Sequence, residues 1–557
     1  MTAQKRKYPV GIQSFESIRM DGYVYVDKTP LIYKMITEGK PYFLSRPRRF
    51  GKSLLVSTLA AVFEGRRELF EAFTTEQGIE QPQLFIARTD WRWEKHPVIR
   101  FDFSSGDLVA IEQLDKLIDA TLKGYESQYG ITPDVPDANI RMVNLMRTMH
   151  RETGKRVVVL VDEYDNFILH ALGDEEKVKL GRQRFQNVFG PLKAEDDHLQ
   201  FAFITGISKF SQMGIFSKLN NLKNISMWPD YECICGISEE ELTTQMRADI
   251  ERMATRNGET YDAMLAELKQ MYDGYHFGED MTDMYNPYSL IKAFDSGKVT
   301  KYWFDSGTPG ALIHMLSQMP PLQLGDVDGV VCESDAFDES FDSYEAPLPA
   351  LYQSGYLTIK SYDRYDDTYT LGFPNHEVRT GFAGSLYRMV TNTTSDNRDR
   401  TALMRAYKLF RRTNELAPFI EAIKTFYASV PFQWERDNRN EHFYHAMLYT
   451  LLTAFGADVR AEESTAKGSS DMTLLMPKAI YVIEVKYERQ RVGEHSSGIH
   501  TAQEALDQIS QKGYADKYLM DGRPVTMVGI AFSQAERNIT EWKAETTKTT
   551  ENDKISG

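Results

Sequence analysis

Residues 41–63 read PYFLSRPRRFGKSLLVSTLAAVF. The apolar run PYFLS predicts a short buried strand, and apolar residues recur at helical spacing from about Ser53 onward. The basic loop RPRRFGKS lies between the two. Strand, loop and helix in this order form the arrangement in which backbone N–H groups at a helix N-terminus hold phosphate.

Three further strands are predicted after this loop, at 97–103, 156–161 and 199–205, with helical stretches between them. Continuous apolar runs such as VVVLV are typical of strands covered on both faces. The sequence therefore predicts an α/β domain built on a parallel sheet.

The loop matches the second half of the phosphate-loop pattern G-x-x-x-x-G-K-[ST], with Arg46 where the first glycine would stand. Gly51, Lys52 and Ser53 supply the backbone amides, the ammonium and the metal-binding hydroxyl that a nucleoside triphosphate and Mg²⁺ need. Because a G-K-S tripeptide also arises by chance, its place between a strand and a helix matters. We predict an ATP site whose loop residues are Arg49, Phe50, Gly51, Lys52, Ser53 and Leu54.

An acidic pair follows the strand VVVLV, at Asp162 and Glu163. We expect Asp162 to hold the Mg²⁺ shell and Glu163 to orient or deprotonate the attacking water. The alternative is an acidic pair that only caps a helix. The next strand ends near Thr205 and Ser208, which either contact the γ-phosphate or the water, or form a plain turn.

A second candidate site lies near the C-terminus, where Asp471 begins one predicted strand and Glu484 and Lys486 lie on the next. Side chains two residues apart on a strand share a face, so one hairpin presents two carboxylates and an ammonium together. Two carboxylates can bind Mg²⁺ or Mn²⁺, which activates water, while a lysine positions it. An exposed strand face with Glu and Lys is the alternative.

Helices on either side of this hairpin offer further candidates. Glu441, on the predicted helix 440–455, is a candidate metal ligand, and this helix also carries His442 and His445. On the helix after the third strand, Gln508 and Tyr514 either brace the site or contact a phosphate, or make ordinary helix-surface hydrogen bonds.

The composition limits the function classes. The chain has 557 residues, enough for about three or four domains, and 42% hydrophobic residues, enough for real cores. Its 65 basic and 80 acidic residues give a net charge of −15, so any nucleic-acid contact must be local. Residues 431–537 carry 12 basic and 15 acidic residues, a net charge of −3, which predicts modest DNA affinity for this part alone.

Three cysteines, Cys233, Cys235 and Cys332, argue against a disulfide framework and for a reducing compartment. The N-terminus lacks a signal-peptide pattern, and no apolar run of about 18 residues predicts a membrane span. We therefore expect a cytoplasmic protein with no membrane partner.

The predicted organisation has five parts. They are a P-loop ATPase core (1–236), a helical lid (237–330), a winged-helix-like unit with linker helices (331–430), a C-terminal α/β domain that carries the second candidate site (431–540) and a flexible tail (541–557).

Several motifs together resemble the AAA-ATPase-like family of bacterial proteins: YVDKTPLIYKMI, FLSRPRRFGKSLLVSTLAAVF, VLVDEYD, FITGISKFS, SKLNNLKNIS, YDGYHF and YNPYSL. The resemblance covers about residues 5–302 and implies a P-loop NTPase fold. Related ATPases also tend to carry basic residues in place of the first glycine. The resemblance implies that Arg46, Arg48 and Arg49 face phosphates of a nucleotide or a nucleic acid; ordinary exposed loop arginines are the alternative.

The C-terminal order of helix, three strands, helix and strand, with D…ExK, resembles the PD-(D/E)XK nuclease superfamily over about residues 431–532. This implies a restriction-endonuclease-like α-β-β-β-α-β fold, a nucleic-acid substrate with DNA favoured over RNA, and a role in defence or mobile-element biology. Relatives usually carry Gly-Arg before the aspartate region, whereas this chain has Gly468 and Ser469. If that arginine grips DNA, cleavage is weakened or lost.

Two functions from different classes therefore stay open. One is an ATP-dependent, metal-dependent nuclease. The other is a nucleotide-gated switch or interaction protein whose nuclease-like domain does not cut. A metabolic P-loop kinase is a third alternative, disfavoured by the long C-terminal region. The sequence leaves the assembly state open, including a homo-oligomer.

Overall fold

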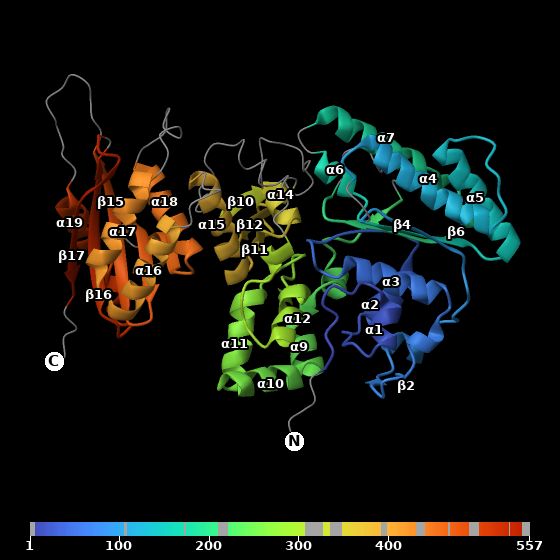
Figure 1. Cartoon of the computed structure of the whole chain (residues 1–557), viewed down its shortest axis with the longest axis horizontal. Coiled ribbons are helices and arrows are strands. Elements are labelled where there is room, and N and C mark those ends of the chain that lie inside the picture. The colour runs from blue at the N-terminus through green and yellow to red at the C-terminus, as the bar shows by residue number, and fades with distance from the viewer. Residues whose placement is uncertain are drawn as a thin grey trace. The chain divides into compact units, whose positions relative to one another are not determined.

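The computed structural model describes residues 6–104, 108–171, 174–209, 221–306, 327–334, 348–391, 398–429, 441–465, 468–488, 501–533 and 535–547. The chain divides into two compact units, with the division after Val378. Figure 1 shows the elements of both, and each unit is described by itself.

The first unit is built on a five-stranded parallel sheet in the order β4-β5-β6-β1-β7. Its strands are β1 (Pro41–Ser45), β4 (Val98–Asp102), β5 (Val157–Asp162), β6 (Leu199–Gly206) and β7 (Lys223–Asn224). All six residues of β5 are buried, as the apolar run predicts. β1 lies between β6 and β7, so the loop that follows β1 starts from an interior strand of the sheet.

Helices cover both faces of this sheet (Figure 1). Those on one face are α1 (Phe15–Met20), α2 (Thr29–Glu38) and α3 (Lys52–Phe63). Those on the other are α4 (Ile111–Gln128), α5 (Ala138–Thr153) and α7 (Glu175–Phe189), with short α6 (Asn166–His170) and α8 (Pro191–Ala194) beside them. A short hairpin is formed by β2 (Phe73–Thr74) and β3 (Glu80–Gln81). The predicted α/β fold class with a P-loop domain is confirmed.

A helical layer follows the sheet in sequence. It comprises α9 (Glu239–Gln245), α10 (Arg247–Asn257), α11 (Tyr261–Tyr272) and α12 (Pro287–Ser296), with β8 (Ile237–Ser238) paired to β9 (Met284–Tyr285). Leu242, Ile250 and Leu268 are among the fully buried residues of its core. These helices occupy the segment where the lid is predicted.

A small three-stranded sheet, β10-β12-β11, completes the first unit. Its elements are β10 (Val330–Glu333), α14 (Leu348–Gln353), β11 (Thr358–Asp363), β12 (Thr368–Gly372) and the start of α15 (His376–Thr391). The helix followed by the antiparallel β11–β12 hairpin matches the predicted order; its assignment as a winged helix stays a prediction.

The second unit holds a mixed five-stranded sheet in the order β13-β14-β15-β16-β17, in which only the β15–β16 pair is parallel. Its strands are β13 (Asp458–Thr465), β14 (Gly468–Met476), β15 (Ala479–Glu488), β16 (Val525–Ser533) and β17 (Asn538–Thr546). Its helices are α16 (Arg398–Thr413), α17 (Leu416–Ser429), α18 (Glu441–Ala454) and α19 (Ala502–Lys512). The α18-β13-β14-β15-α19-β16 order confirms the predicted nuclease-like fold class.

The prediction of a flexible tail from residue 541 is wrong for the first part of that segment. β17 pairs antiparallel with β16 through Thr546. Its charged residues Glu541, Lys543 and Glu545 alternate with Trp542 and Ala544, which is the period of a half-exposed edge strand. The Thr-, Lys- and Glu-rich composition of this segment suggested a frayed end. The alternation of charged residues with Trp542 and Ala544 is the pattern that indicates the strand.

No helix among the described ranges combines the length and the apolar character needed to span a lipid bilayer.

Because Ile539 in β17 is 2% exposed, Ile539→Ala should lower the free energy of unfolding by about 2–4 kcal/mol. Glu545→Ala, on the exposed end of the same strand, should change it by less than about 0.5 kcal/mol. Urea unfolding of both variants measures the difference. Equal stabilities would show that β17 does not pack on its sheet in solution.

Candidate functional site

The phosphate loop joins β1 to α3. Gly51 is the N-cap residue of α3 and has φ 90°, a left-handed conformation that glycine adopts without strain. The first N–H groups of α3 have no partner within the helix, so they are available to a phosphate. The sequence thus places glycine where the loop turns into the helix.

Lys52 is 5% exposed and its Nζ donates to the backbone carbonyls of Arg46 and Pro47, each at 2.9 Å. Burial lowers the pKa of Lys52, although the nearby carboxylates of Glu163, Asp165 and Asp162 act in the opposite direction. The ammonium is therefore poorly solvated, and within the described residues it donates to neutral carbonyls. A triphosphate would be a much stronger acceptor for it.

Asp162 ends β5 with an exposed fraction of 1%. Burial raises the pKa of Asp162, while a hydrogen bond from Ser53 and the charge of Lys52 oppose that rise. Its Oδ1 is buried and accepts no hydrogen bond from any of the described residues. A buried carboxylate oxygen left without a donor, beside the Ser53 hydroxyl, fits the oxygen ligands that Mg²⁺ prefers.

Glu163 follows in a left-handed conformation, with φ 49°, which is uncommon for a residue other than glycine. Burial raises the pKa of Glu163, and Lys52 and Arg48 oppose the rise. The chain turns at Glu163, directly after β5. This turn places a second carboxylate where the charges of Lys52 and Arg48 act on it.

Thr205 and Ser208 are both fully buried and both hydroxyls already donate within the protein. Thr205 Oγ1 donates to the carbonyl of Leu44 at 2.7 Å. Ser208 Oγ donates to Asp165 Oδ2 at 2.5 Å. These contacts favour the turn alternative over direct phosphate contact.

Asp165 is a residue that the sequence analysis missed. Its Oδ2 also accepts from the backbone N–H groups of Ile207 and Ser208, at 2.9 and 2.6 Å. It thereby fixes the end of β6 against the end of β5. Gly206 permits this approach, because a Cβ there would lie 2.4 Å from Asp165 Oδ1. In the sequence, the third acidic residue of VDEYD was the feature that could have identified Asp165.

The three loop arginines have different environments. Arg46 is 1% exposed, and its guanidinium donates to the carbonyls of Ser45, Ser226 and Tyr231 at 2.9, 2.7 and 3.1 Å. The expectation that Arg46 faces a phosphate is therefore wrong, because its Nη1 and Nη2 groups donate to buried backbone carbonyls.

Arg49 is exposed and lies over the Tyr288 ring at 4.8 Å, a cation–π contact. Arg48 is half-buried. Phe50 is 1% exposed and packs edge-on against Tyr275 and Phe277, with ring centroids at 4.8 and 5.2 Å. Phe50 was predicted to bind the nucleotide, but its side chain packs against other aromatic rings inside the protein.

An apolar cavity lies directly beside the loop. It is bounded by Gly51 and Leu54 of the loop, by an N-terminal strip and by the helical layer; the other lining residues include Val24, Val26, Thr58, Cys235, Ile237 and Ile291. Its volume of about 80 Å³ is well below the roughly 300–1,000 Å³ of a small-molecule pocket, so a flat apolar group joined to a phosphate chain on α3 would enter it only in part. The sequence analysis did not find it, because its walls come from segments far apart in the chain.

In the second unit, Asp471, Glu484 and Lys486 meet on the β14–β15 pair. The backbone N–H of Asp471 donates to Glu484 Oε2 at 3.3 Å, and that of Val485 donates to Asp471 Oδ2 at 2.7 Å. Lys486 Nζ lies 3.3 Å from Glu484 Oε1. The predicted hairpin therefore brings the two carboxylates and the ammonium together.

Glu484 is 1% exposed, and burial, reinforced by Asp471, raises its pKa to about 7. Lys486 opposes this rise. Gln508 donates its side-chain amide to Glu484 Oε1 and so braces the carboxylate from α19. Two neighbouring carboxylates that repel each other in a buried place fit a divalent cation, which would favour both charged forms.

Tyr514 makes no hydrogen bond to this cluster within the described ranges. It is 3% exposed and packs in the core with Ile480, Val482 and Leu506, and its hydroxyl lies beside Gly468. Tyr514 therefore braces α19 against β14. The side chain of Glu441 lies outside the described residues, so its proposed ligand role stays a prediction.

His445 is a residue that sequence reasoning named without a role. Its Nε2 lies 2.6 Å from the carbonyl oxygen of Asp471 and the ring is 8% exposed. It fixes the backbone that carries the Asp471 carboxylate. Its spacing of four residues from Glu441, which places both on one helix face, was the available signal.

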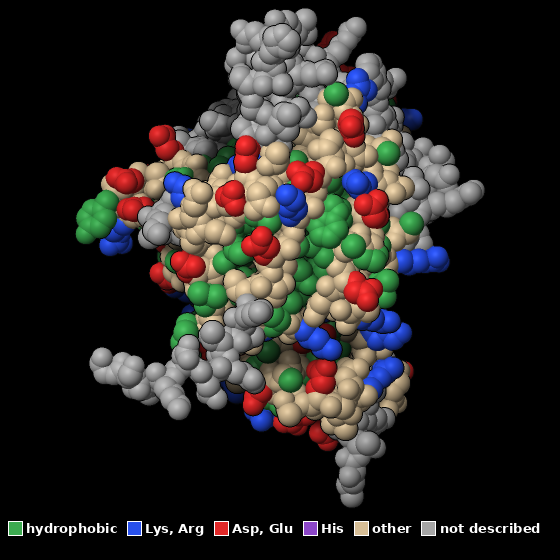
Figure 2. Space-filling model, turned by 90° about the vertical axis from the view of Figure 1, so that its left-hand side faces the viewer, with side chains coloured by type: hydrophobic (Ala, Val, Ile, Leu, Met, Phe, Trp, Pro, Cys, Tyr) green, Lys and Arg blue, Asp and Glu red, His purple; other side chains and the backbone are tan. Residues whose placement is uncertain are grey.

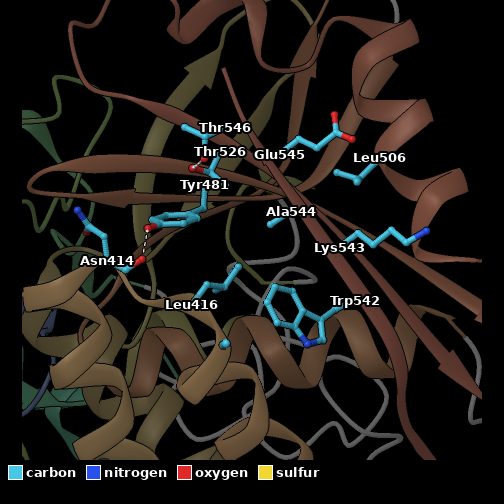
Figure 3. A pocket seen from close by; sticks show the side chains of 11 residues that line it. Asn414, Leu416, Tyr481, Leu506, Thr526, Trp542, Lys543, Ala544, Glu545 and Thr546 are labelled. Carbon is cyan, nitrogen blue, oxygen red and sulfur yellow. Dashed lines mark hydrogen bonds between the residues drawn. The ribbon is translucent and has the colours of Figure 1, made fainter. Parts of the chain in front are cut away.

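A larger groove in the second unit has a different character. Its lining residues are Asn414, Leu416, Ala417, Tyr481, Leu506, Thr526, Trp542, Lys543, Ala544, Glu545 and Thr546 (Figure 3). Hydrophobic side chains gather over the face of the molecule shown in Figure 2, between charged ones. The groove includes neither Asp471 nor Glu484, and its lining is not suited to metal-assisted phosphate chemistry.

Two family profiles match the chain. The predicted AAA-ATPase family matches residues 9–216, and the PD-(D/E)XK nuclease superfamily matches residues 439–542. An uncharacterized protein in the vnfD 5′ region of Azotobacter chroococcum mcd 1 is 34% identical over 553 residues, which cover 97% of this chain and 99% of that protein. The chain belongs to this family of predicted AAA-ATPases with a C-terminal PD-(D/E)XK nuclease domain.

The family's two regions contain both candidate sites, since Lys52 and Asp162 fall in the first match and Asp471 and Glu484 in the second. No solved structure matches the chain at a significant level. The recognition made from sequence motifs is confirmed.

The raised pKa of Glu484 predicts a pH-dependent stability in metal-free buffer. The carboxyl titrates at an ordinary value of 4.5 when unfolded and at about 7 when folded. Between these values the folded state holds a proton that the unfolded state has lost. The free energy of unfolding should therefore fall as pH rises from 4.5 to 7, by on the order of 3 kcal/mol.

Glu484→Gln should remove this contribution, whereas the exposed Glu545→Gln should keep it. Urea unfolding in EDTA across this pH range measures the slope. An unchanged slope in Glu484→Gln would contradict the inference that burial raises the pKa of the Glu484 carboxyl.

Proposed function

We propose that the chain binds and hydrolyses ATP through its N-terminal site and cleaves nucleic acid, with DNA favoured over RNA, through its C-terminal site in a divalent-metal-dependent reaction. The observation that carries the nuclease half is the junction of Asp471, Glu484 and Lys486 on one strand pair, with Glu484 buried and braced by Gln508. The family matches support the same pairing of domains.

The N-terminal residues divide the work of holding and hydrolysing the nucleotide. Lys52 releases the loop carbonyls and pairs with the phosphates, and the N–H groups at the start of α3 hold phosphate oxygens. Ser53 and Asp162 are the residues that would hold Mg²⁺, which when bound neutralises phosphate charge. Glu163 orients the attacking water and accepts its proton.

The apolar cavity beside Gly51 and Leu54 supports a nucleotide rather than inorganic phosphate. It receives part of the base, and the ligand then contacts both its N-terminal wall and its helical-layer wall. This placement makes the helical layer responsive to nucleotide, which supports a coupling between binding and conformation.

In the C-terminal site, Asp471 and Glu484 are the residues that would hold the divalent cation, which lowers the pKa of a bound water. Lys486 positions that water and stabilises charge on the phosphate. Gln508 orients Glu484, and His445 holds the backbone at Asp471. A Ser at position 469 instead of the usual arginine leaves DNA affinity dependent on other surfaces.

Lys52→Ala should weaken ATP binding by about 10- to 100-fold, because a charge-assisted contact contributes about 1.5–3 kcal/mol. Fluorescent ATP-analogue titration of the full chain measures the affinity. Lys95→Ala, an exposed lysine on the same unit, is the matched control. Equal affinities for the two variants would refute the phosphate-loop assignment.

Asp471→Asn and Lys486→Ala should each lower Mg²⁺- or Mn²⁺-dependent cleavage of single- or double-stranded DNA by at least about 100-fold, with the fold retained. Gel assays with and without ATP measure the rate, and the exposed Asp516→Asn serves as the control. If the unmodified chain cleaves neither DNA nor RNA but binds ATP normally, the non-cleaving, nucleotide-gated switch replaces this proposal.

A further inference from the structure

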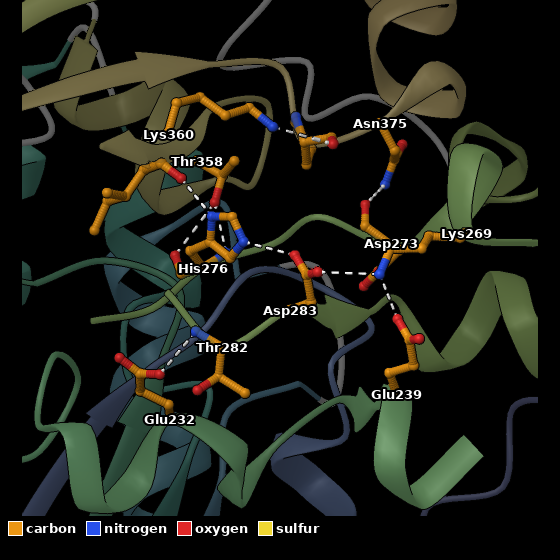
Figure 4. A network of polar contacts seen from close by, with 12 residues as sticks. Glu232, Glu239, Lys269, Asp273, His276, Thr282, Asp283, Thr358, Lys360 and Asn375 are labelled. Atoms are coloured by element: carbon orange, nitrogen blue, oxygen red, sulfur yellow. Dashed lines mark hydrogen bonds and ion pairs between the residues drawn. The ribbon is translucent and has the colours of Figure 1, made fainter. Parts of the chain in front are cut away.

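Three carboxylates from separate segments meet in the helical layer of the first unit. Glu239 begins α9, Asp273 follows α11, and Asp283 precedes β9. Each offers an oxygen atom, and these atoms all lie within 4.8 Å of one another (Figure 4). The cluster is separate from both candidate catalytic sites, and Asp273 belongs to the motif YDGYHF, which the nucleotide site does not use.

Asp273 is the least compensated member. It is 2% exposed, and no side chain donates a hydrogen bond to its carboxylate in the described part of the chain; the backbone N–H of Gly274 and the Lys269 ammonium are its polar neighbours. Its Oδ2 forms a long ion pair with Lys269 Nζ, at 3.7 Å. Burial raises the pKa of Asp273 to about 7, with a further contribution from Asp283. Buried carboxylates normally accept several hydrogen bonds, so an acceptor is left open here.

The neighbouring carboxylates already have partners. Lys269 Nζ contacts Glu239 Oε2 and lies 3.3 Å from Asp283 Oδ2. His276 Nε2 lies 2.8 Å from Asp283 Oδ1, and its Nδ1 lies 2.6 Å from the carbonyl of Ile359. Lys360, also near, donates to the carbonyl of Pro374. The ammonium of Lys269 thus occupies the space toward which all three carboxylates converge (Figure 4).

We propose that Glu239, Asp273 and Asp283 bind a divalent cation of the oxygen-preferring class, Mg²⁺, Ca²⁺ or Mn²⁺, and that the Lys269 ammonium holds this position when no cation is bound. Three carboxylates with an all-oxygen donor set match the ligand preference of these ions. The carboxylate of Asp273, whose ion pair with Lys269 is long at 3.7 Å, would give the cation a closer contact than it gives the ammonium.

Lys269 can leave without disturbing the core. Its side chain is 46% exposed, and it sits on a flexible stem whose ammonium is well hydrated in solvent. A small dication in its place would contact all three carboxylates at shorter distances than the ammonium does. The Lys269 ammonium and an external cation would therefore compete for the same position among the three carboxylates.

The site is connected to the phosphate loop by a short segment. Asp273 and Phe277 are four residues apart, and the Phe277 ring lies 4.2 Å from the Arg46 guanidinium carbon and packs against Phe50. The carbonyl of Asp273 also accepts from Asn375 at 2.9 Å. A cation at Asp273 would therefore fix the segment that covers the loop.

The test uses the full chain carrying Ser53→Ala and Asp471→Asn, which weaken the two other candidate cation sites. Mn²⁺ titration followed by electron paramagnetic resonance, without nucleotide, counts bound ions and gives their affinity. We expect one Mn²⁺ to bind this background. Adding Asp273→Asn should weaken binding at least tenfold, whereas adding Lys269→Ala should tighten it severalfold. Glu267→Gln, on α11 outside the cluster, is the matched control and should change neither.

The two variants move the affinity in opposite directions, so a general loss of folding cannot imitate the result. Thermal melting without metal checks that each variant folds. Absence of bound Mn²⁺ in the background, or an affinity that Lys269→Ala leaves unchanged or weakens, would overturn the proposal and leave a purely internal ion-pair network. The same holds if Asp273→Asn folds and binds Mn²⁺ as Glu267→Gln does.

Discussion

A carboxylate that is removed from water without enough donors is the constraint on which both candidate sites depend. Asp162 and Glu484 are each 1% exposed and end or lie in sheet strands surrounded by apolar residues. Burial raises the pKa of both groups. The protein supplies one lysine near each, Lys52 and Lys486, which offsets part of the cost. The remaining deficit is what a divalent cation would compensate.

The two sites solve this problem with different strand arrangements. In the first unit, parallel strands deliver Asp162 and the phosphate loop to the same sheet edge, with β6 between them. In the second unit, an antiparallel pair places Asp471 opposite the Glu484 region, and α19 adds Gln508 from one face. Topology, more than local sequence, decides which side chains meet.

Much of the architecture could be predicted because it is encoded locally. The run VVVLV and the helical spacing after Ser53 identify buried strands and α3, and D…ExK gives the hairpin that unites Asp471 with Glu484. What could not be predicted depends on contacts between distant segments. Asp165 acts on the end of β6, His445 on the backbone of β14, and the carbonyls that hold Arg46 come partly from Ser226 and Tyr231. A charged loop residue looks exposed in sequence until such acceptors are known.

The buried Arg46 also has a consequence for how ligand enters. Because its guanidinium binds three backbone carbonyls and stacks on Phe277, the shape of the loop is set during folding. A phosphate group bound at this loop would therefore meet backbone that is already ordered around Arg46, and binding would lose little free energy to ordering the chain. The Lys52 side chain, which donates to the carbonyls of Arg46 and Pro47, would still have to move before it could pair with that phosphate.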